Sequence, residues 1–266
     1  TLGTTIESKD DLNVKADDTP VTAADFAIQG FVAAELSRSF PDVKFMGEED
    51  ADALRTDKDL CEAARSMAAK LSGDSSPSTA DFIQAVDRGI EDFTPSKERY
   101  WALDPIDGTK GLITGQQYVV GLSLIDVNGE VLVGAMGNPA ASPSVLVAAK
   151  DQGAQFYTEE GKFEDLPSAG PSWSHRKYEY SRFDSSSTND DEDEDDWGCG
   201  VEEAGVDYPP FLLSRPMSEG SPLPFGPCCA PSDICCGAMV KYWAVATGQA
   251  AGFVQFQTKL KTVSTF

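Results

Sequence analysis

Two aspartates three residues apart are the clearest candidates for chemistry in this sequence. Asp104 and Asp107 follow an apolar, aromatic run that begins at Tyr100, and Gly108 and Thr109 come directly after them. The pattern predicts a buried strand that ends in two carboxylates and then turns into a short helix. Carboxylate oxygens suit a hard cation and the free N–H groups of a helix start suit an anion, so a metal ion beside a phosphate is one interpretation. Asp-Pro and Asp-Gly are also common turn dipeptides, and a turn without chemistry is the other interpretation.

A second group of acids follows another short apolar run. Residues 43–46 predict a strand, and Glu48, Glu49 and Asp50 come directly after Gly47. A charged run after a strand is often only a solvated loop. Two strands that both end in acids nevertheless favour a shared site.

A third carboxylate, Asp25, lies near the start of a predicted helix over residues 23–39. Thr22 and Asp25 have the spacing of a capping box, in which each residue satisfies a backbone or side-chain group of the other. Asp25 therefore either caps its own helix or faces the site from a rigid helix start, and both can hold.

The remaining stretches indicate a chain that mixes helices with antiparallel sheet. Residues 52–72 and 80–90 have helix-favouring composition, whereas residues 118–158 are rich in Val, Leu and Ile. Hairpin signals occur at Asn128-Gly129 and at Asp151-Gln152-Gly153. The pattern predicts the α+β fold class.

The length allows one large domain or two modest ones that share a core. Beyond residue 160, we expect a helix at 237–247, a strand at 251–256, and a disordered acidic surface insertion near 184–196.

The composition excludes several classes of partner. The formal net charge is −23, which repels nucleic acid polymers and anionic membranes. No apolar run is long enough to span a bilayer. The six cysteines do not have the spacing of a small disulfide scaffold, so we expect a reducing intracellular compartment, either the cytoplasm or an organelle entered by way of a removed leader. We expect a monomer.

Three separated stretches resemble the inositol monophosphatase superfamily of metal-dependent phosphatases. They are Thr-Pro-Val-Thr-Ala-Ala-Asp at 19–25, Gly-Glu-Glu at 47–49 and Asp-Pro-Ile-Asp-Gly-Thr at 104–109. Within the superfamily, Asp-Gly-Thr-Lys-Gly at 107–111 and Met-Val-Lys-Tyr at 239–242 are similar to the eukaryotic 3′(2′),5′-bisphosphate nucleotidases. The resemblance implies a layered αβαβα sandwich in two domains. Residues 1–160 would form an N-terminal α+β lobe with the metal and phosphate motifs, and residues 161–266 would form a smaller C-terminal α/β lobe.

The resemblance also implies an activity, namely removal of the 3′-phosphate of adenosine 3′,5′-bisphosphate, or of its sulfated form, in sulfur assimilation. The cofactor would be two or three Mg²⁺ ions, and the enzyme would be lithium-sensitive. The small phosphate ester would be bound by residues that match the family's motifs. The implied metal ligands are Glu48, Asp104, Asp107 and the carbonyl of Ile106; the implied catalytic pair is Asp25 and Thr109; the implied substrate contacts are Asp107, Gly108, Thr109 and Lys241.

The sequence departs from the family pattern near its end. The family has a late Trp-Asp-His motif whose aspartate completes a metal site, and no such motif follows Lys261 before Phe266. Ala238 also occupies a position where the family has serine. We therefore expect an incomplete C-terminal lobe. Two alternatives stay open, an inositol phosphate phosphatase and a non-catalytic relative that binds nucleotide or metal.

Overall fold

The computed structural model describes residues 13–14, 20–73, 76–90, 92–141, 144–158, 160–166, 211–213, 237–247 and 252–254. Two compact units are present: Thr1–Leu166 with Ile234–Trp243, and Pro167–Asp233 with Ala244–Phe266. The domain boundary expected near residue 160 stays a prediction. The predicted acidic insertion near 184–196 and all cysteines except Cys61 lie outside the described residues.

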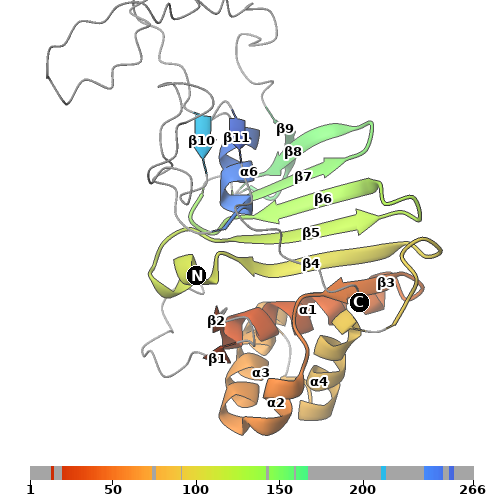
Figure 1. Ribbon diagram of the computed structural model, residues 1–266, viewed down its shortest axis with the longest axis vertical. Helices are drawn as coiled ribbons and strands as arrows, with labels where there is room; N and C mark the ends of the chain where they lie inside the picture. Colours follow the sequence, from red (N-terminus) through yellow and green to blue (C-terminus); the bar gives the residue numbers. More distant parts are fainter. Residues whose placement is uncertain are drawn as a thin grey trace, which may run out of the picture. The chain divides into compact units, whose positions relative to one another are not determined.

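A seven-stranded sheet dominates the first unit (Figure 1). Its spatial order is β3-β4-β5-β6-β7-β8-β9, and only the β3–β4 pair is parallel. The strands are β3 Lys44–Gly47, β4 Tyr100–Asp107, β5 Val119–Ile125, β6 Val131–Gly137, β7 Val145–Ala149, β8 Gly153–Tyr157 and β9 Phe163–Asp165. A separate short antiparallel pair joins β1 Asn13–Val14 to β2 Pro20–Val21.

Local turn chemistry produces the antiparallel hairpins. Asn128 and Gly129 connect β5 to β6, and Gly129 adopts a positive φ of 79° that a side chain would oppose. Asp126 accepts the backbone N–H groups of Asn128 and Glu130, which closes the turn. Asp151, with φ 62°, lies in the turn between β7 and β8. Both predicted hairpins are confirmed.

The helices begin and end where their sequences provide caps. They are α1 Ala23–Ser39, α2 Asp52–Thr56, α3 Lys58–Ser72, α4 Thr79–Asp87, the 3₁₀ turn η3 Arg88–Ile90, α5 Thr109–Ile113 and α6 Met239–Ala246. Asp57 caps α3 by accepting two backbone N–H groups, and Ser78 caps α4. Gly73 ends α3 in the left-handed conformation. Of the described residues, none belong to a helix with the length and apolar character to cross a membrane.

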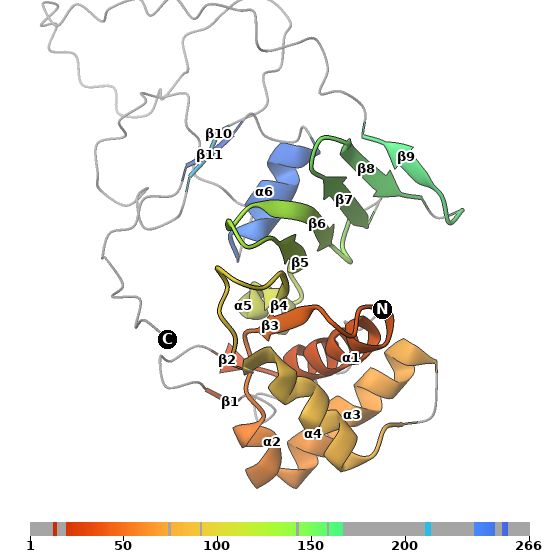
Figure 2. The same cartoon turned by 90° about the vertical axis from the view of Figure 1, so that its right-hand side faces the viewer.

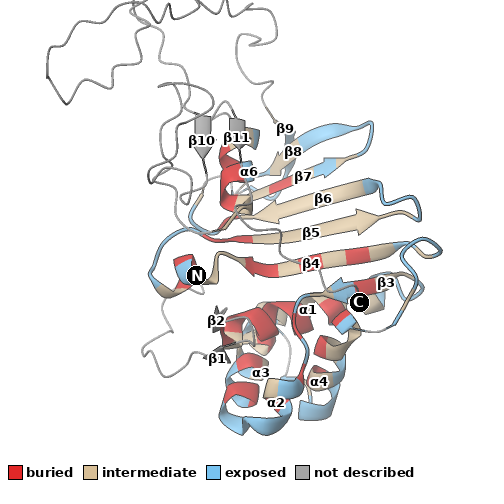
Figure 3. Ribbon diagram, in the orientation of Figure 1, coloured by how far each residue is buried: buried red, intermediate tan, exposed pale blue. Residues whose placement is uncertain are grey.

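Helices cover both faces of the sheet. Alternate residues of β5 face opposite sides: Val120, Leu122 and Leu124 join the apolar cluster under α1, whereas Val119 packs with Val240 and Trp243 of α6. Helices α2, α3 and α4 pack on α1 through a second cluster away from the sheet. Figure 2 shows α1 to α4 gathered beside β3 and β4, and Figure 3 shows buried positions on α1, β4 and α6.

The second unit contains one described strand pair. β10 Phe211–Leu213 and β11 Gly252–Val254 run parallel to each other. The strand predicted at 251–256 is thus confirmed at residues 252–254. The seven-stranded sheet with helices on both of its faces confirms the predicted α+β class and supplies the α, β and α layers expected of a layered sandwich.

Candidate active site

The parallel pairing of β3 with β4 places two acidic strand ends side by side. Gly47 pairs with Leu103, so Glu48 and Asp104 are the next residues along each strand. The carboxyl ends of parallel strands lie at the same edge of a sheet, which is why the two acids become neighbours. The predicted shared position of these two strand ends is therefore present in the fold.

A β-bulge brings the second aspartate of β4 into the same region. The register against β5 shifts between Asp104, which pairs with Gly121, and Asp107, which pairs with Val119. Residues three apart on a regular strand point to opposite faces, and an irregularity of this kind changes that alternation. Pro105 lies inside the bulge and has no N–H to donate to the ladder, which makes it compatible with this interruption.

The start of α1 brings Asp25 to the same strand end. Its Oδ2 accepts the backbone N–H of Thr22 at 2.8 Å and the Thr22 hydroxyl at 2.7 Å, while the same hydroxyl accepts the N–H of Ala24 at 3.2 Å. Ala24 packs with Ile106 of β4 in one apolar cluster. The predicted capping box is confirmed, and the charge of Asp25 also acts on Asp104.

Asp104 carries the strongest electrostatic perturbation of these acids. Burial first, and then the neighbouring charges of Glu48, Asp107 and Asp25, raise the pKa of Asp104 to about 7, against the opposing effect of the Ile106 N–H. Its Oδ1 is buried and has no hydrogen-bond partner. A buried carboxylate oxygen without a partner is costly unless a cation or a proton compensates it.

Asp107 connects the strand end to a segment far away in the chain. Its Oδ2 accepts the backbone N–H of Met239 at 2.5 Å, at the first turn of α6. Burial raises the pKa of Asp107, and the N–H groups of Met239 and Ala238 and the charge of Lys241 act in the opposite direction. A side chain at Gly237 would collide with the Asp107 carboxylate, so this approach requires glycine.

Lys241 and the turn after β4 complete the set of residues expected at the site. Lys241 is largely buried and donates from Nζ to the carbonyl of Gly237 at 2.8 Å. Gly108 precedes α5 with a positive φ of 98°, and the hydroxyl of Thr109 donates to the Ile106 carbonyl at 3.3 Å. The roles implied for these residues stay predictions.

The carboxylates of Glu48, Asp104 and Asp107 are the type of ligand that a hard divalent cation prefers, although they are not close enough to one another to share an ion. Among the residues that the structure describes, no three carboxylate, imidazole or thiol groups lie close enough together to hold an ion. Glu48 and Asp107 both act on Asp104 as like charges, so these acids repel one another where no cation is present. A divalent cation would offset that repulsion and satisfy the Asp104 Oδ1, so the residues fit Mg²⁺.

Sequence reasoning missed one residue of this region, Gln29. Its side-chain amide is fully buried and makes hydrogen bonds with the backbone of Glu49, directly after Glu48. Gln29 follows the apolar run Phe26–Ile28 and precedes Gly30, and a polar residue at this position was the signal that could have found it. Its partners are backbone groups, which no sequence pattern reveals.

The sequence pattern of the inositol monophosphatase family matches residues 3–262. This chain belongs to the inositol monophosphatase family. The acidic stretches at the ends of β3 and β4 and at the start of α1 thus lie within a family match that spans nearly the whole chain.

Relatives within the family carry nucleotidase names. The chain is 42% identical over 138 residues to an Arabidopsis thaliana protein whose name includes the words 3′(2′),5′-bisphosphate nucleotidase and mitochondrial, covering 50% of this chain and 34% of that protein. It is 40% identical over 137 residues to the 3′(2′),5′-bisphosphate nucleotidase of Emericella nidulans, covering 47% and 38%. A second Arabidopsis thaliana protein, 3′,5′-bisphosphate nucleotidase 2, is 38% identical over 151 residues, covering 53% and 43%. The matched part of the chain thus spans about a third to two fifths of these relatives.

A solved inositol monophosphatase, type II from Staphylococcus aureus MSSA476, is also similar, with 12% identity and a TM-score of 0.32 over 86% of this chain and 61% of that one.

Proposed function

We propose that the protein is a Mg²⁺-dependent phosphomonoester hydrolase that removes the 3′-phosphate of adenosine 3′,5′-bisphosphate to give AMP. The observation that carries this proposal is the buried, uncompensated Oδ1 of Asp104 among the charges of Glu48, Asp107 and Asp25. The names of the relatives support the choice of a bisphosphate nucleotide as substrate.

A phosphate monoester dianion repels an incoming nucleophile, so its hydrolysis requires nearby positive charge and an oriented water. Bound Mg²⁺ supplies that positive charge and acidifies water. Glu48, Asp104, Asp107 and the Ile106 carbonyl are the proposed ligands. All of these donors are oxygens, which suits Mg²⁺. The family resemblance implies two or three such ions.

The chain's own groups would orient the reactants. Asp25 is held by Thr22 at the rigid start of α1, and we assign it, with Thr109, to the orientation of the attacking water. The N–H groups at Gly108 and Thr109 are assigned to the phosphate, because a turn that opens a helix directs its free donors outward. Lys241 is assigned to an anionic group of the nucleotide.

The test is phosphate release from adenosine 3′,5′-bisphosphate, with and without Mg²⁺, and with AMP identified by chromatography. We expect release only with Mg²⁺, and we expect Asp104→Asn to abolish it while the fold is retained. Nucleotide binding detected by calorimetry without any release would instead support the non-catalytic alternative.

The description of the matching family favours one second candidate, an inositol phosphate phosphatase. Rates on inositol 1-phosphate and inositol 1,4-bisphosphate, measured beside the nucleotide under the same Mg²⁺ concentration, separate the two. A clear preference for either inositol phosphate would replace the nucleotide as the proposed substrate.

A further inference from the structure

The amide of Gln29 binds a loop that carries an implied metal ligand. Nε2 donates to the carbonyl of Glu49 at 2.5 Å and to the carbonyl of Val86 at 2.9 Å. Oε1 accepts the N–H of Glu49 at 2.9 Å. The Gln29 side chain is 0% exposed, so these bonds form away from water. One amide thus joins α1, the loop after β3 and the end of α4.

Two glycines make the space in which this amide lies. A Cβ added at Gly47 would stand 2.5 Å from the Cδ and Oε1 of Gln29, and one added at Gly89 would stand 2.7 Å from its Nε2. Separations of this size are shorter than van der Waals contact, so any side chain at either position would displace the amide. The position is therefore specific to glutamine in its shape as well as in its hydrogen bonds.

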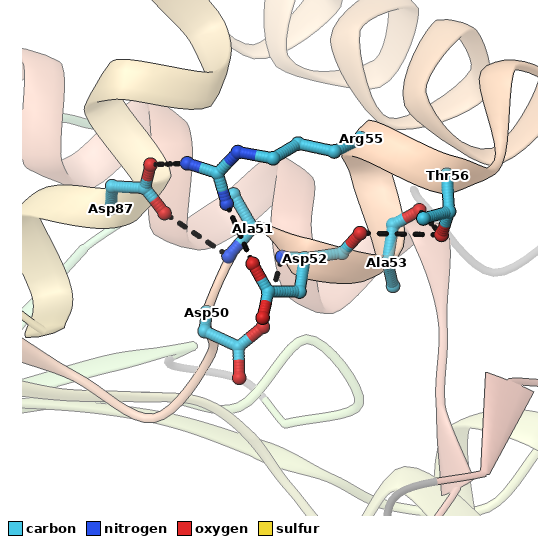
Figure 4. Close-up of polar contacts among 7 residues, drawn as sticks. All are labelled: Asp50, Ala51, Asp52, Ala53, Arg55, Thr56 and Asp87. Carbon is cyan, nitrogen blue, oxygen red and sulfur yellow. Dashed lines mark hydrogen bonds and ion pairs between the residues drawn. The ribbon is translucent and has the colours of Figure 1, made fainter.

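The pair of bonds to Glu49 fixes a backbone rather than a side chain. The same residue donates its N–H to Gln29 and accepts from it, so the peptide units on both sides of Glu49 are held. One of these units joins Glu49 to Glu48. The loop is held again two residues later, where Asp87 accepts the N–H of Ala51 at 3.2 Å and also pairs with Arg55 (Figure 4).

We propose that Gln29 is a positioning residue that holds Glu48 beside Asp104 and thereby sets the affinity of the site for a divalent cation. This inference rests on the metal-dependent function proposed above. Glu48 is itself exposed, and its backbone would sample many orientations without such a restraint. Fixing the peptide next to it removes much of that freedom before the cation binds.

A purely structural role is the competing explanation, because the bond to Val86 also ties α1 to α4. The two explanations differ in what they predict for cation affinity measured where every variant is folded. A structural role lowers the midpoint of unfolding and leaves the affinity unchanged. A positioning role lowers the affinity itself.

The test uses the full 266-residue chain and Mn²⁺ binding followed by electron paramagnetic resonance of the free ion. Binding that disappears in Asp104→Asn defines the site and separates it from ions held elsewhere on an acidic protein. We expect Gln29→Met, which keeps the length but not the amide, to weaken this binding about 10-fold or more. The matched control is Ser78→Ala, which removes the cap of α4 without touching Gln29, and it should unfold at a lower temperature with wild-type affinity.

Gly89→Ala is the second variant, because its Cβ would stand 2.7 Å from the Gln29 Nε2 while Gln29 itself is retained, and it should weaken binding in the same direction. The same Cβ would stand 3.0 Å from the backbone of Gly47, so Gln29→Met is the variant that decides the role of the amide. Hydrogen exchange on the wild-type chain adds a measurement that needs no variant, and the Glu49 amide should be protected. Exchange of that amide at the rate of an open loop would overturn the inference.

The outcomes of the titration separate the inference from the function on which it rests. Wild-type binding together with unchanged affinity in Gln29→Met overturns the positioning role and leaves the proposed function in place. No site-specific binding by the wild type overturns the proposed metal site, and the inference with it.

Discussion

Asp104 is the residue whose surroundings most constrain the chemistry. Burial and three neighbouring carboxylates raise its pKa to about 7, compared with 3.8 for an ordinary aspartate. The folded protein therefore binds this proton more tightly than the unfolded chain does. Without metal, the contribution of Asp104 to folding therefore becomes less favourable as the pH rises from about 4 to about 7, and the full penalty applies above pH 7.

Asp104→Asn should consequently stabilise the metal-free protein at pH 8 and have little effect at pH 4. Each pKa unit corresponds to about 1.4 kcal/mol, and with allowance for partial exposure we expect a gain of about 2 kcal/mol at pH 8. Urea unfolding in the presence of a chelator measures it. The control is Asp151→Asn, which removes the same charge from an exposed turn at a φ of 62° that asparagine tolerates. A less stable Asp104→Asn at pH 8 would contradict the assignment.

At the scale of elements, the capping box of α1 both begins a helix and holds Asp25. Thr22→Ala removes the acceptor for the Ala24 N–H and the donor to Asp25. We expect a loss of about 1 kcal/mol in the free energy of unfolding, measured by urea denaturation. Thr22→Ser keeps the hydroxyl and should retain most of the stability. Equal losses in the two variants would show that the methyl group, and not the cap, is responsible.

The contact between α6 and β5 depends on a glycine. A side chain at Gly121 would overlap the sulfur of Met239, the residue whose N–H binds Asp107. Valine at this position must displace the flexible end of the Met239 side chain, so Gly121→Val should destabilise the protein by about 1 kcal/mol, seen as a lower urea midpoint. Gly134→Val on the adjacent β6 is the control, because a Cβ there meets nothing within 4 Å. A similar loss in both variants would mean that strand glycine alone explains the effect.

The helices and strands were largely predictable from sequence, whereas most contacts between residues far apart in the chain were not. The α1 cap and the hairpin at Asn128-Gly129 are local and follow from residues within a few positions. The bulge at Asp104 and the bond from Met239 to Asp107 depend on partners many residues away. Local patterns contain no information on such partners. The acids and the shared position of the two acidic strand ends could thus be predicted from the chain, but the backbone groups that hold these acids could not.

At the scale of the molecule, a net charge of −23 makes self-repulsion a general cost of the compact state. Any salt should relieve part of that cost by screening. A specific cation site adds a separate gain, which reaches about 2.7 kcal/mol when the ion is at 100 times its dissociation constant.

Thermal unfolding in MgCl₂ and in NaCl at matched ionic strength separates these effects. We expect MgCl₂ to raise the midpoint above the NaCl value in the wild type, and the excess to vanish in Asp104→Asn. Identical midpoints in both salts for the wild type would indicate screening alone.

The bond between Asp107 and Met239 joins residues 132 positions apart, while the hairpins of the large sheet pair strands that are adjacent in sequence. Closing a long loop costs more entropy than zipping adjacent strands, so the sheet has a path to form early and this bond forms late. During synthesis, every implied carboxylate ligand leaves the ribosome well before Met239 does. A nascent chain can therefore pair the strands of the large sheet before Met239 is available to bind Asp107, and we expect the contact of α6 with this strand end to form after the sheet.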